Sequence, residues 1–285
     1  MKFYRAGKID FSYLESDQEI QPVEVVQLSH YKRLSYFVNI LKKYHPTEID
    51  RYLSELEFYY KSIVKEDYIS INHFDVRTIL SDFEFLKDKP DLTKLILNFL
   101  LQELQLEQKA NWREDKLTVT LRNWLRGLLI PRYNNLLVLT KLIGREEAIK
   151  LFKIYRSDYR KATDNPDQEP FENLIQFKEK YFDGKQLDGT EVIYSDVING
   201  KFFYKKTNCT WNEAVKDLPD KELRYYALCY GDFQGATFWN DSFILTMKHT
   251  VANDDGYCSC VLHDTREDWD LTHPPKEFWD KMNAE

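Results

Sequence analysis

The stretch VIYSDVINGKFFY, residues 192–204, decides the fold class of this chain. Its Asn199-Gly200 pair stands between two runs of β-branched and aromatic residues, which is the strongest short-range signal of a two-residue hairpin. A second hairpin is predicted where residues 243–251 meet residues 257–263 across a turn rich in Asn, Asp and Gly. Between the hairpins, residues 211–228 have apolar side chains at helical spacing. The sequence therefore predicts an antiparallel sheet with helices on one face.

The first 180 residues are predicted to be mainly helical, because apolar residues recur every three or four positions in segments 34–41, 53–63 and 148–159. The segment 92–104 is apolar almost all round and is expected deep in a core. Pro131 is expected to end a helix, since proline lacks the amide hydrogen that a helix interior needs. The predicted fold class is α+β: a helical N-terminal region, residues 1–110, precedes a domain of antiparallel sheet and helices, residues 111–285.

The composition excludes several classes of partner. A net charge of −7 provides no basic face for a nucleic acid. No apolar run reaches the roughly 18 residues that a membrane-spanning helix needs, and residues 1–10 lack the apolar core of a secretory signal. We therefore expect a cytoplasmic protein without nucleic-acid or membrane partners, whose four cysteines remain thiols.

The cysteines are the most informative residues, because the first 208 positions contain none and the rest of the chain contains four. Cys229 and Asp232 are expected at the end of a helix that Gly231 interrupts, which lets the carboxylate turn inward. Cys209 is expected between a strand and a helix, where helix N-terminal amides lower the pKa of a thiol. Thiolates and carboxylate-activated water both attack electrophilic carbon, so these residue types suit hydrolytic chemistry.

The other two cysteines lie on the predicted strand 257–264, in which alternate side chains face opposite ways. One face is expected to carry Cys258, Cys260 and Asp264, and the other to carry Tyr257, Ser259 and His263. The same alternation lets at most one of Lys205 and Lys206 point toward a pocket beside the cysteines.

Three segments together resemble the L-2-amino-thiazoline-4-carboxylic acid hydrolase family. They are Asn208-Cys209-Thr210-Trp211, Leu228-Cys229-Tyr230-Gly231-Asp232-Phe233, and TVANDDGYCSC at residues 250–260. The shared order is a cysteine after a strand, a helix ending in Cys-x-x-Asp, and then a threonine-containing strand, a glycine turn and a cysteine. The resemblance covers the C-terminal sheet region, extends loosely back to residue 110, and matches nothing in the N-terminal helices.

The resemblance implies a hydrolase that opens a C–N or C–S bond of a small heterocyclic or amide-like substrate. The family's pattern positions carry over as Cys209, Cys229, Asp232 and Cys258. We expect Cys229 to be the nucleophile and Asp232 the acid or base, with Cys258 as a further catalytic residue and Cys209 in the wall of the same pocket. The other substrate-binding residues expected there are Asn208, Trp211, Tyr257, Cys260, Asp264 and His263. No cofactor is expected.

Other functions stay open at this point. A metal site is one, because zinc and iron accept the ligand types of Cys229, Cys258, Cys260 and either Asp264 or His263. A non-catalytic small-ligand-binding module is another, with the N-terminal helices as a homodimer or partner surface. A purely structural role is the third, since a free cysteine often packs as a small hydrophobe. The sequence contains no phosphate-loop, dinucleotide-binding, Gly-x-Ser-x-Gly or His-Glu-x-x-His motif, which argues against those enzyme classes.

Overall fold

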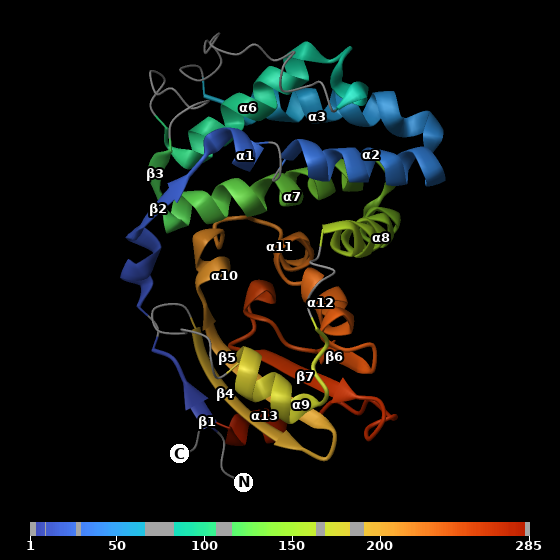
Figure 1. Cartoon of the computed structure of the whole chain (residues 1–285). Helices are drawn as coiled ribbons and strands as arrows, with labels where there is room; N and C mark the ends of the chain where they lie inside the picture. Colours follow the sequence, from blue (N-terminus) through green and yellow to red (C-terminus); the bar gives the residue numbers. More distant parts are fainter. Residues whose placement is uncertain are drawn as a thin grey trace. The chain divides into compact units, whose positions relative to one another are not determined.

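The structure is a computed structural model that describes residues 4–8, 10–26, 30–65, 83–106, 116–163, 169–182 and 191–282. The chain packs as two compact units, shown with their elements labelled in Figure 1. The C-terminal unit comprises Met1–Tyr13 and Arg160–Glu285, and the helical unit comprises Leu14–Tyr159. The predicted boundary after residue 110 falls inside the helical unit, because helices on both sides of that position pack together.

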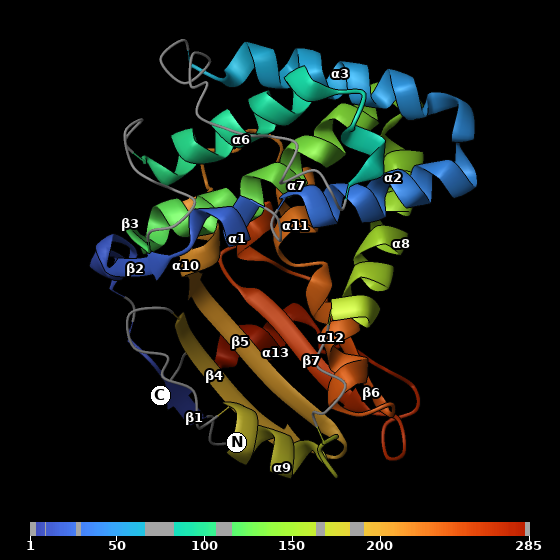
Figure 2. The same cartoon turned by 45° about the horizontal axis from the view of Figure 1, so that its top comes forward.

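The C-terminal unit is built on a five-stranded antiparallel sheet with helices packed against it, which confirms the predicted α+β fold class. Figures 1 and 2 show the sheet from two directions, and its strands in spatial order are β1 (Tyr4–Ala6), β4 (Glu191–Ile198), β5 (Lys201–Cys209), β7 (Cys258–Asp264) and β6 (Phe243–Met247). The edge strand β1 has no counterpart in the sequence-based prediction. Its three residues are too few to show an alternating pattern, and they form a strand because they pair with β4.

Both predicted hairpins are present. The turn between β4 and β5 is Asn199-Gly200, whose φ angles of 48° and 70° lie in the left-handed region that a tight hairpin requires. Strand β6 pairs antiparallel with β7. Their connection contains the 3-10 turn η7 (Val251–Asn253) and then Asp254 at a φ of 65°. This longer connection supplies one wall of a cavity.

Replacing Gly200 with alanine is expected to destabilise this unit by about 1–3 kcal/mol. The left-handed φ disfavours a side chain, and an added Cβ would lie 2.6 Å from the Cβ of Glu267 and 3.2 Å from the backbone N of Asp268. Gly256→Ala is the matched control, because nothing lies within 4 Å of its added Cβ. Chemical denaturation measures both free energies of unfolding, and equal losses in the two variants would contradict this explanation.

Apolar side chains cover both faces of the sheet. On one face, α9 (Leu174–Phe177) and α12 (Gly231–Trp239) pack against a cluster that contains Phe202, Cys260 and Leu262. On the opposite face, α13 (Lys276–Lys281) packs Trp279 against Phe203, and Figure 2 shows α13 behind the sheet. The prediction of helices on one face is therefore incomplete. Consecutive Phe202 and Phe203 send rings to opposite faces, so each face needs its own cover.

Two short helices, α10 (Thr210–Ala214) and α11 (Lys221–Leu228), precede α12 in the chain. Helix α11 begins where the side chain of Asp220 accepts the backbone N–H of Leu223, and Cys229 caps its C-terminal end. The predicted helix end at Cys229 is confirmed, whereas the prediction that Gly231 interrupts this helix is wrong. A new helix begins at Gly231, so Asp232 lies in the first turn of α12.

The described part of the helical unit contains α1 (Pro22–Val26), α2 (Lys32–Tyr44), α3 (Ile49–Ile63), α6 (Pro90–Leu104), α7 (Leu121–Ile143) and most of α8 (Arg145–Thr163), with β2 (Asp17–Ile20) paired to β3 (Leu117–Thr120). Helix α6 is buried along almost its whole length, as predicted. Helix α7 continues through Pro131, so the prediction that this residue ends a helix is wrong. Tertiary packing on a long helix outweighs the loss of one hydrogen bond. No helix among the described residues is long and apolar enough to cross a membrane.

Candidate functional site

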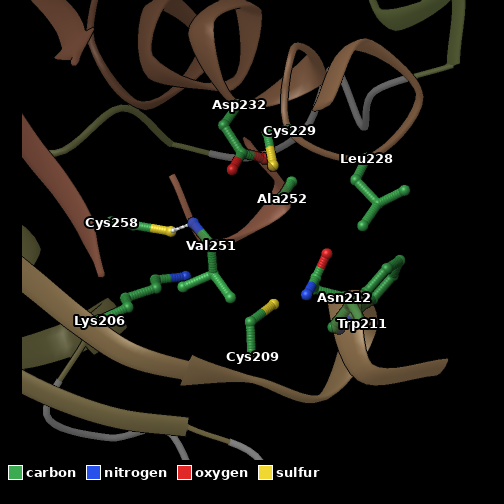
Figure 3. A pocket seen from close by; sticks show the side chains of 10 residues that line it. All are labelled: Lys206, Cys209, Trp211, Asn212, Leu228, Cys229, Asp232, Val251, Ala252 and Cys258. Atoms are coloured by element: carbon green, nitrogen blue, oxygen red, sulfur yellow. Dashed lines mark hydrogen bonds between the residues drawn. The ribbon is translucent and has the colours of Figure 1, made fainter. Parts of the chain in front are cut away.

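A cavity of about 250 Å³ lies in the C-terminal unit, and Figure 3 shows the side chains that line it. Its walls come from β5, α10, α11 and the residue that follows it, α12, η7 and β7. The lining residues are Lys206, Cys209, Trp211, Asn212, Leu228, Cys229, Asp232, Val251, Ala252 and Cys258.

Three thiols enter this cavity from different sides (Figure 3). Cys209 ends β5, Cys229 follows α11, and Cys258 begins β7. Asp232 is a close neighbour of Cys229, whose backbone carbonyl accepts the Asp232 N–H at 3.0 Å. The cavity therefore unites five residues predicted from the sequence: Cys209, Trp211, Cys229, Asp232 and Cys258.

Cys258 has surroundings that favour negative charge on its sulfur. Its Sγ accepts a hydrogen bond from the backbone N–H of Val251 at 3.3 Å, drawn as a dashed line in Figure 3. Val251 is the first residue of η7, so its N–H has no acceptor within that turn. Lys206 is the cross-strand neighbour of Cys258 on β5, and its side chain also lines the cavity. A hydrogen-bond donor and a nearby cation both stabilise a thiolate.

The side chains of Lys205 and Lys206 on β5 point to opposite faces of the sheet, as the alternation of side chains along a strand predicted. Lys206 lines the cavity, whereas Lys205 is 1% exposed and donates a hydrogen bond of 2.6 Å to the backbone carbonyl of Trp279 in α13, on the opposite face of the sheet. Lys205 also lies 4.2 Å from the ring centroid of Tyr257. It therefore anchors the C-terminal end of α13, where the carbonyl oxygens of a helix attract a cation.

The loop that presents the Val251 N–H is held by its own polar groups. The Thr250 hydroxyl accepts the N–H of Asn253 at 3.2 Å, and the Thr250 N–H donates to the Asp255 carboxylate at 2.8 Å. The Asp255 N–H in turn donates to the Thr250 carbonyl at 3.1 Å. These hydrogen bonds fix the backbone on both sides of Val251, so the direction of its N–H is fixed as well.

Arg224 of α11 ties the same loop to the rest of the unit. Its side chain is 5% exposed, and its Nε donates to the carbonyl of Ala252 at 2.9 Å. One terminal nitrogen donates to the carbonyl of Lys216 at 2.8 Å, and the other pairs with the carboxylate of Asp254. The guanidinium therefore joins α11 to Lys216 before it and to the distant loop 252–254, and it fixes the wall of the cavity formed by η7.

Burial raises the pKa of the Cys229 thiol well above its ordinary value, and negative charge on Cys258 and Asp232 raises it further. Cys229 is partly exposed as a residue, but its sulfur is enclosed by the cavity walls. Burial raises the pKa of Cys260 in the same way. Both thiols are therefore protonated at neutral pH, and Cys229 is suited to donate a proton or contact a ligand.

Five residues predicted to bind substrate do not line this cavity: Asn208, Tyr257, Cys260, Asp264 and His263. Cys260 is 1% exposed within the apolar cluster on the same face of the sheet. The Asp264 carboxylate is held by Arg266, whose guanidinium lowers the pKa of that carboxyl. Tyr257 packs with the α13 cluster and His263 joins a separate polar network, so both lie on the far face, as alternation predicted. The Asn208 side chain donates to Thr207 at 3.4 Å.

Sequence reasoning missed several groups in the cavity wall. Asn212 lies one position after the predicted Trp211, and Leu228 one position before Cys229. The Val251 N–H is the most consequential of these groups. A backbone donor leaves no side-chain pattern in a sequence, so only the conformation of the loop reveals it.

The metal-binding alternative has no donor set in the part of the chain that the structure describes. There, no group of three or more His, Cys, Asp or Glu side chains is arranged to hold a metal ion. The physical reasons are local. His263 points away from the cysteine face of β7, and the carboxylate of Asp264 is paired with Arg266.

No family model matches this chain, and comparisons with curated proteins and with solved structures find no match. The likeness to the thiazoline-carboxylate hydrolases therefore depends on its motif residues alone. The geometry itself defines a class, namely an α+β protein with a small cavity that contains thiols, a carboxylate and a lysine.

Proposed function

We propose that this chain is a cysteine-dependent hydrolase of a C–N or C–S bond in a small heterocyclic or amide-like substrate. The observation that supports this most strongly is the Val251 N–H directed at Cys258 Sγ, in a cavity that also contains Cys229 and Asp232. A volume of about 250 Å³ suits a small molecule, since pockets for drug-sized ligands are usually larger.

In this proposal Cys258 is the attacking sulfur. Its proton passes to the Asp232 carboxylate, and the thiolate that remains forms a bond to the electrophilic carbon of the substrate. The C–N or C–S bond then breaks, and the leaving nitrogen or sulfur takes the electron pair and the proton from Asp232. Water attacks the S-linked intermediate, which releases the second product and restores the Cys258 thiol.

This assignment differs from the expectation that Cys229 is the nucleophile. The raised pKa of Cys229 keeps its proton in place at neutral pH, whereas Cys258 has the N–H donor and the neighbouring lysine. Cys229 then serves as a proton donor or a contact for the substrate, and Cys209 and Trp211 form the wall that faces it across the cavity (Figure 3).

The test is hydrolysis by the purified full chain. L-2-amino-thiazoline-4-carboxylate is offered first, followed by small cyclic amidines, amides and thioesters, and products are followed by mass spectrometry. We expect release of a thiol or an amine that stops after the cavity cysteines are alkylated with iodoacetamide. Hydrolysis that continues at the same rate after complete alkylation would contradict the proposal, as would no hydrolysis of any compound.

A small-ligand-binding protein without catalytic activity is the second candidate. The raised pKa values of Cys229 and Cys260 favour it, because neutral buried thiols are chemically quiet. The two candidates differ in the Cys258→Ser variant. A binding protein should keep nearly its full affinity for the ligand, whereas an enzyme should bind the substrate and fail to convert it.

A further inference from the structure

A buried hydrogen-bonded network lies on the face of β7 opposite the cavity. Ser259 is 0% exposed and immediately follows Cys258, so its side chain points to that opposite face. Its Oγ lies 3.2 Å from His273 Nε2 and 3.1 Å from His249 Nδ1. The same oxygen accepts the backbone N–H of His249 at 3.1 Å.

The network continues from His273 to the other end of β7. Thr246 of β6 places its Oγ1 2.9 Å from His273 Nδ1 and 2.7 Å from His263 Nε2. His263 Nδ1 lies 2.5 Å from Asp268 Oδ2, and the other oxygen of Asp268 pairs with Lys201. We call the series Lys201, Asp268, His263, Thr246, His273, Ser259 and His249 the histidine relay.

The direction of every hydrogen bond in the relay follows from Asp268, because a carboxylate paired with a lysine accepts and does not donate. His263 must therefore carry its hydrogen on Nδ1, and its Nε2 accepts the one hydrogen of the Thr246 hydroxyl. Thr246 then accepts from His273 Nδ1–H, so His273 Nε2 accepts the Ser259 hydroxyl hydrogen. The Ser259 oxygen then accepts hydrogen bonds from the backbone N–H and the Nδ1–H of His249.

His263 and His273 are neutral at pH 7, as this direction requires. Burial lowers the pKa of His273 to about 4, and positive charge on Lys248 adds to the effect. Burial also lowers the pKa of His263, opposed by Asp268 and Asp270 and assisted by Lys201. The lowered pKa of each histidine disfavours a second proton on its ring. Such a proton would lie on Nε2, the nitrogen that accepts a hydrogen bond in the relay.

The relay ends at the backbone that carries the Val251 N–H. Ser259 holds His249 twice, since its N–H donates to the His249 carbonyl at 3.1 Å and its Oγ accepts the His249 N–H. Two residues later, the Val251 N–H reaches Cys258 Sγ. Consecutive residues of β7 therefore fix the segment 249–251, Ser259 from one face and Cys258 from the other.

We propose that Ser259, oriented by the histidine relay, is a positioning residue that holds the Val251 N–H against the sulfur of Cys258. The proposal rests on the proposed function, in which Cys258 reacts as a thiolate. Without the Ser259 hydroxyl, the His249 N–H loses its acceptor and the backbone at Val251 is free to turn away. Cys258 then loses the donor that stabilises its negative charge.

The test is the pH at which Cys258 becomes reactive, measured in the full chain by iodoacetamide labelling and peptide mass spectrometry. In Ser259→Ala we expect the midpoint of the Cys258 rate to rise by about one pH unit, equivalent to a tenfold loss of thiolate. Ser195→Ala is the matched control, because Ser195 is 1% exposed on β4 and its hydroxyl has no hydrogen-bond partner among the residues that the structure describes. We expect no shift of the Cys258 midpoint in that control.

The possible outcomes separate the two proposals. A wild-type Cys258 midpoint no lower than that of an ordinary cysteine, about 8.5, would contradict the proposed function. A low wild-type midpoint that stays unchanged in Ser259→Ala would overturn the positioning role alone. A shift of the same size in Ser195→Ala would also overturn it, because any buried serine would then have this effect.

A second measurement uses the wild-type chain and therefore does not depend on how well Ser259→Ala folds. Long-range ¹H–¹⁵N NMR of the imidazoles at neutral pH should show hydrogen on Nδ1 in His249, His263 and His273. His45 is the control, since its Nε2 lies 3.3 Å from the Glu147 carboxylate and should carry the hydrogen. Hydrogen on Nε2 of His263 or His273 would overturn the relay and, with it, the positioning of Ser259.

Discussion

Replacing Cys258 with serine is expected to lower substrate turnover by at least about a thousandfold. A serine hydroxyl is far less acidic than a thiol, so the Asp232 carboxylate and the Val251 N–H do not convert it to an alkoxide at neutral pH. The cavity keeps its shape, because serine differs from cysteine only in having oxygen in place of sulfur. Cys258 is 7% exposed. Steady-state kinetics with the substrate found in the hydrolysis screen measures this effect, and KM should change much less than kcat.

Cys260→Ala is the matched control for this variant. Cys260 lies on the same face of β7, two residues further along, but it packs in the apolar cluster and does not line the cavity. We expect its turnover to stay within about threefold of the wild type, a change below 1 kcal/mol in the activation barrier. Equal losses in both variants would indicate damage to the sheet and would contradict a chemical role for Cys258.

Replacing Arg224 with methionine is expected to lower the free energy of unfolding by about 3 kcal/mol. The variant removes hydrogen bonds to the carbonyls of Ala252 and Lys216 and leaves the Asp254 carboxylate without its partner. Methionine fills much of the same volume, so the loss reflects polar groups left unsatisfied rather than an empty space. Urea denaturation followed by tryptophan fluorescence measures this change.

Lys276→Met is the corresponding surface control. Its side chain is 65% exposed and pairs with Asp280, which is 49% exposed, so we expect a loss below about 1 kcal/mol, as for other exposed ion pairs. If Arg224→Met were no more destabilising than Lys276→Met, Arg224 would not be holding η7 in place. The cavity wall would then depend on other contacts.

The strand pairing around the cavity could be predicted from local sequence signals. Asn199-Gly200 favours left-handed conformations at two successive positions, and few structures other than a tight hairpin use them. Alternation along residues 257–264 correctly separated the face of Cys258 and Cys260 from the face of Ser259 and His263. These predictions succeed because they depend on neighbouring residues and on the geometry of one strand.

The features that could not be predicted depend on contacts between distant segments. Strand β1 exists because residues 4–6 pair with β4, and α13 covers a second sheet face from the end of the chain. Arg266 is only two residues from Asp264, yet nothing in the sequence shows that it removes this carboxylate from the candidate site. The raised pKa of Cys229 arises from burial, which a sequence does not display.

The most direct test of the central claim is the pH dependence of alkylation of all four cysteines in the wild-type chain. We predict that Cys258 reacts at the lowest pH. Cys229 and Cys260 should react only at a pH above that of an ordinary thiol, because burial raises the pKa of each. Selective labelling of Cys229 near neutral pH, with Cys258 inert, would contradict the assignment of Cys258 as the reacting sulfur.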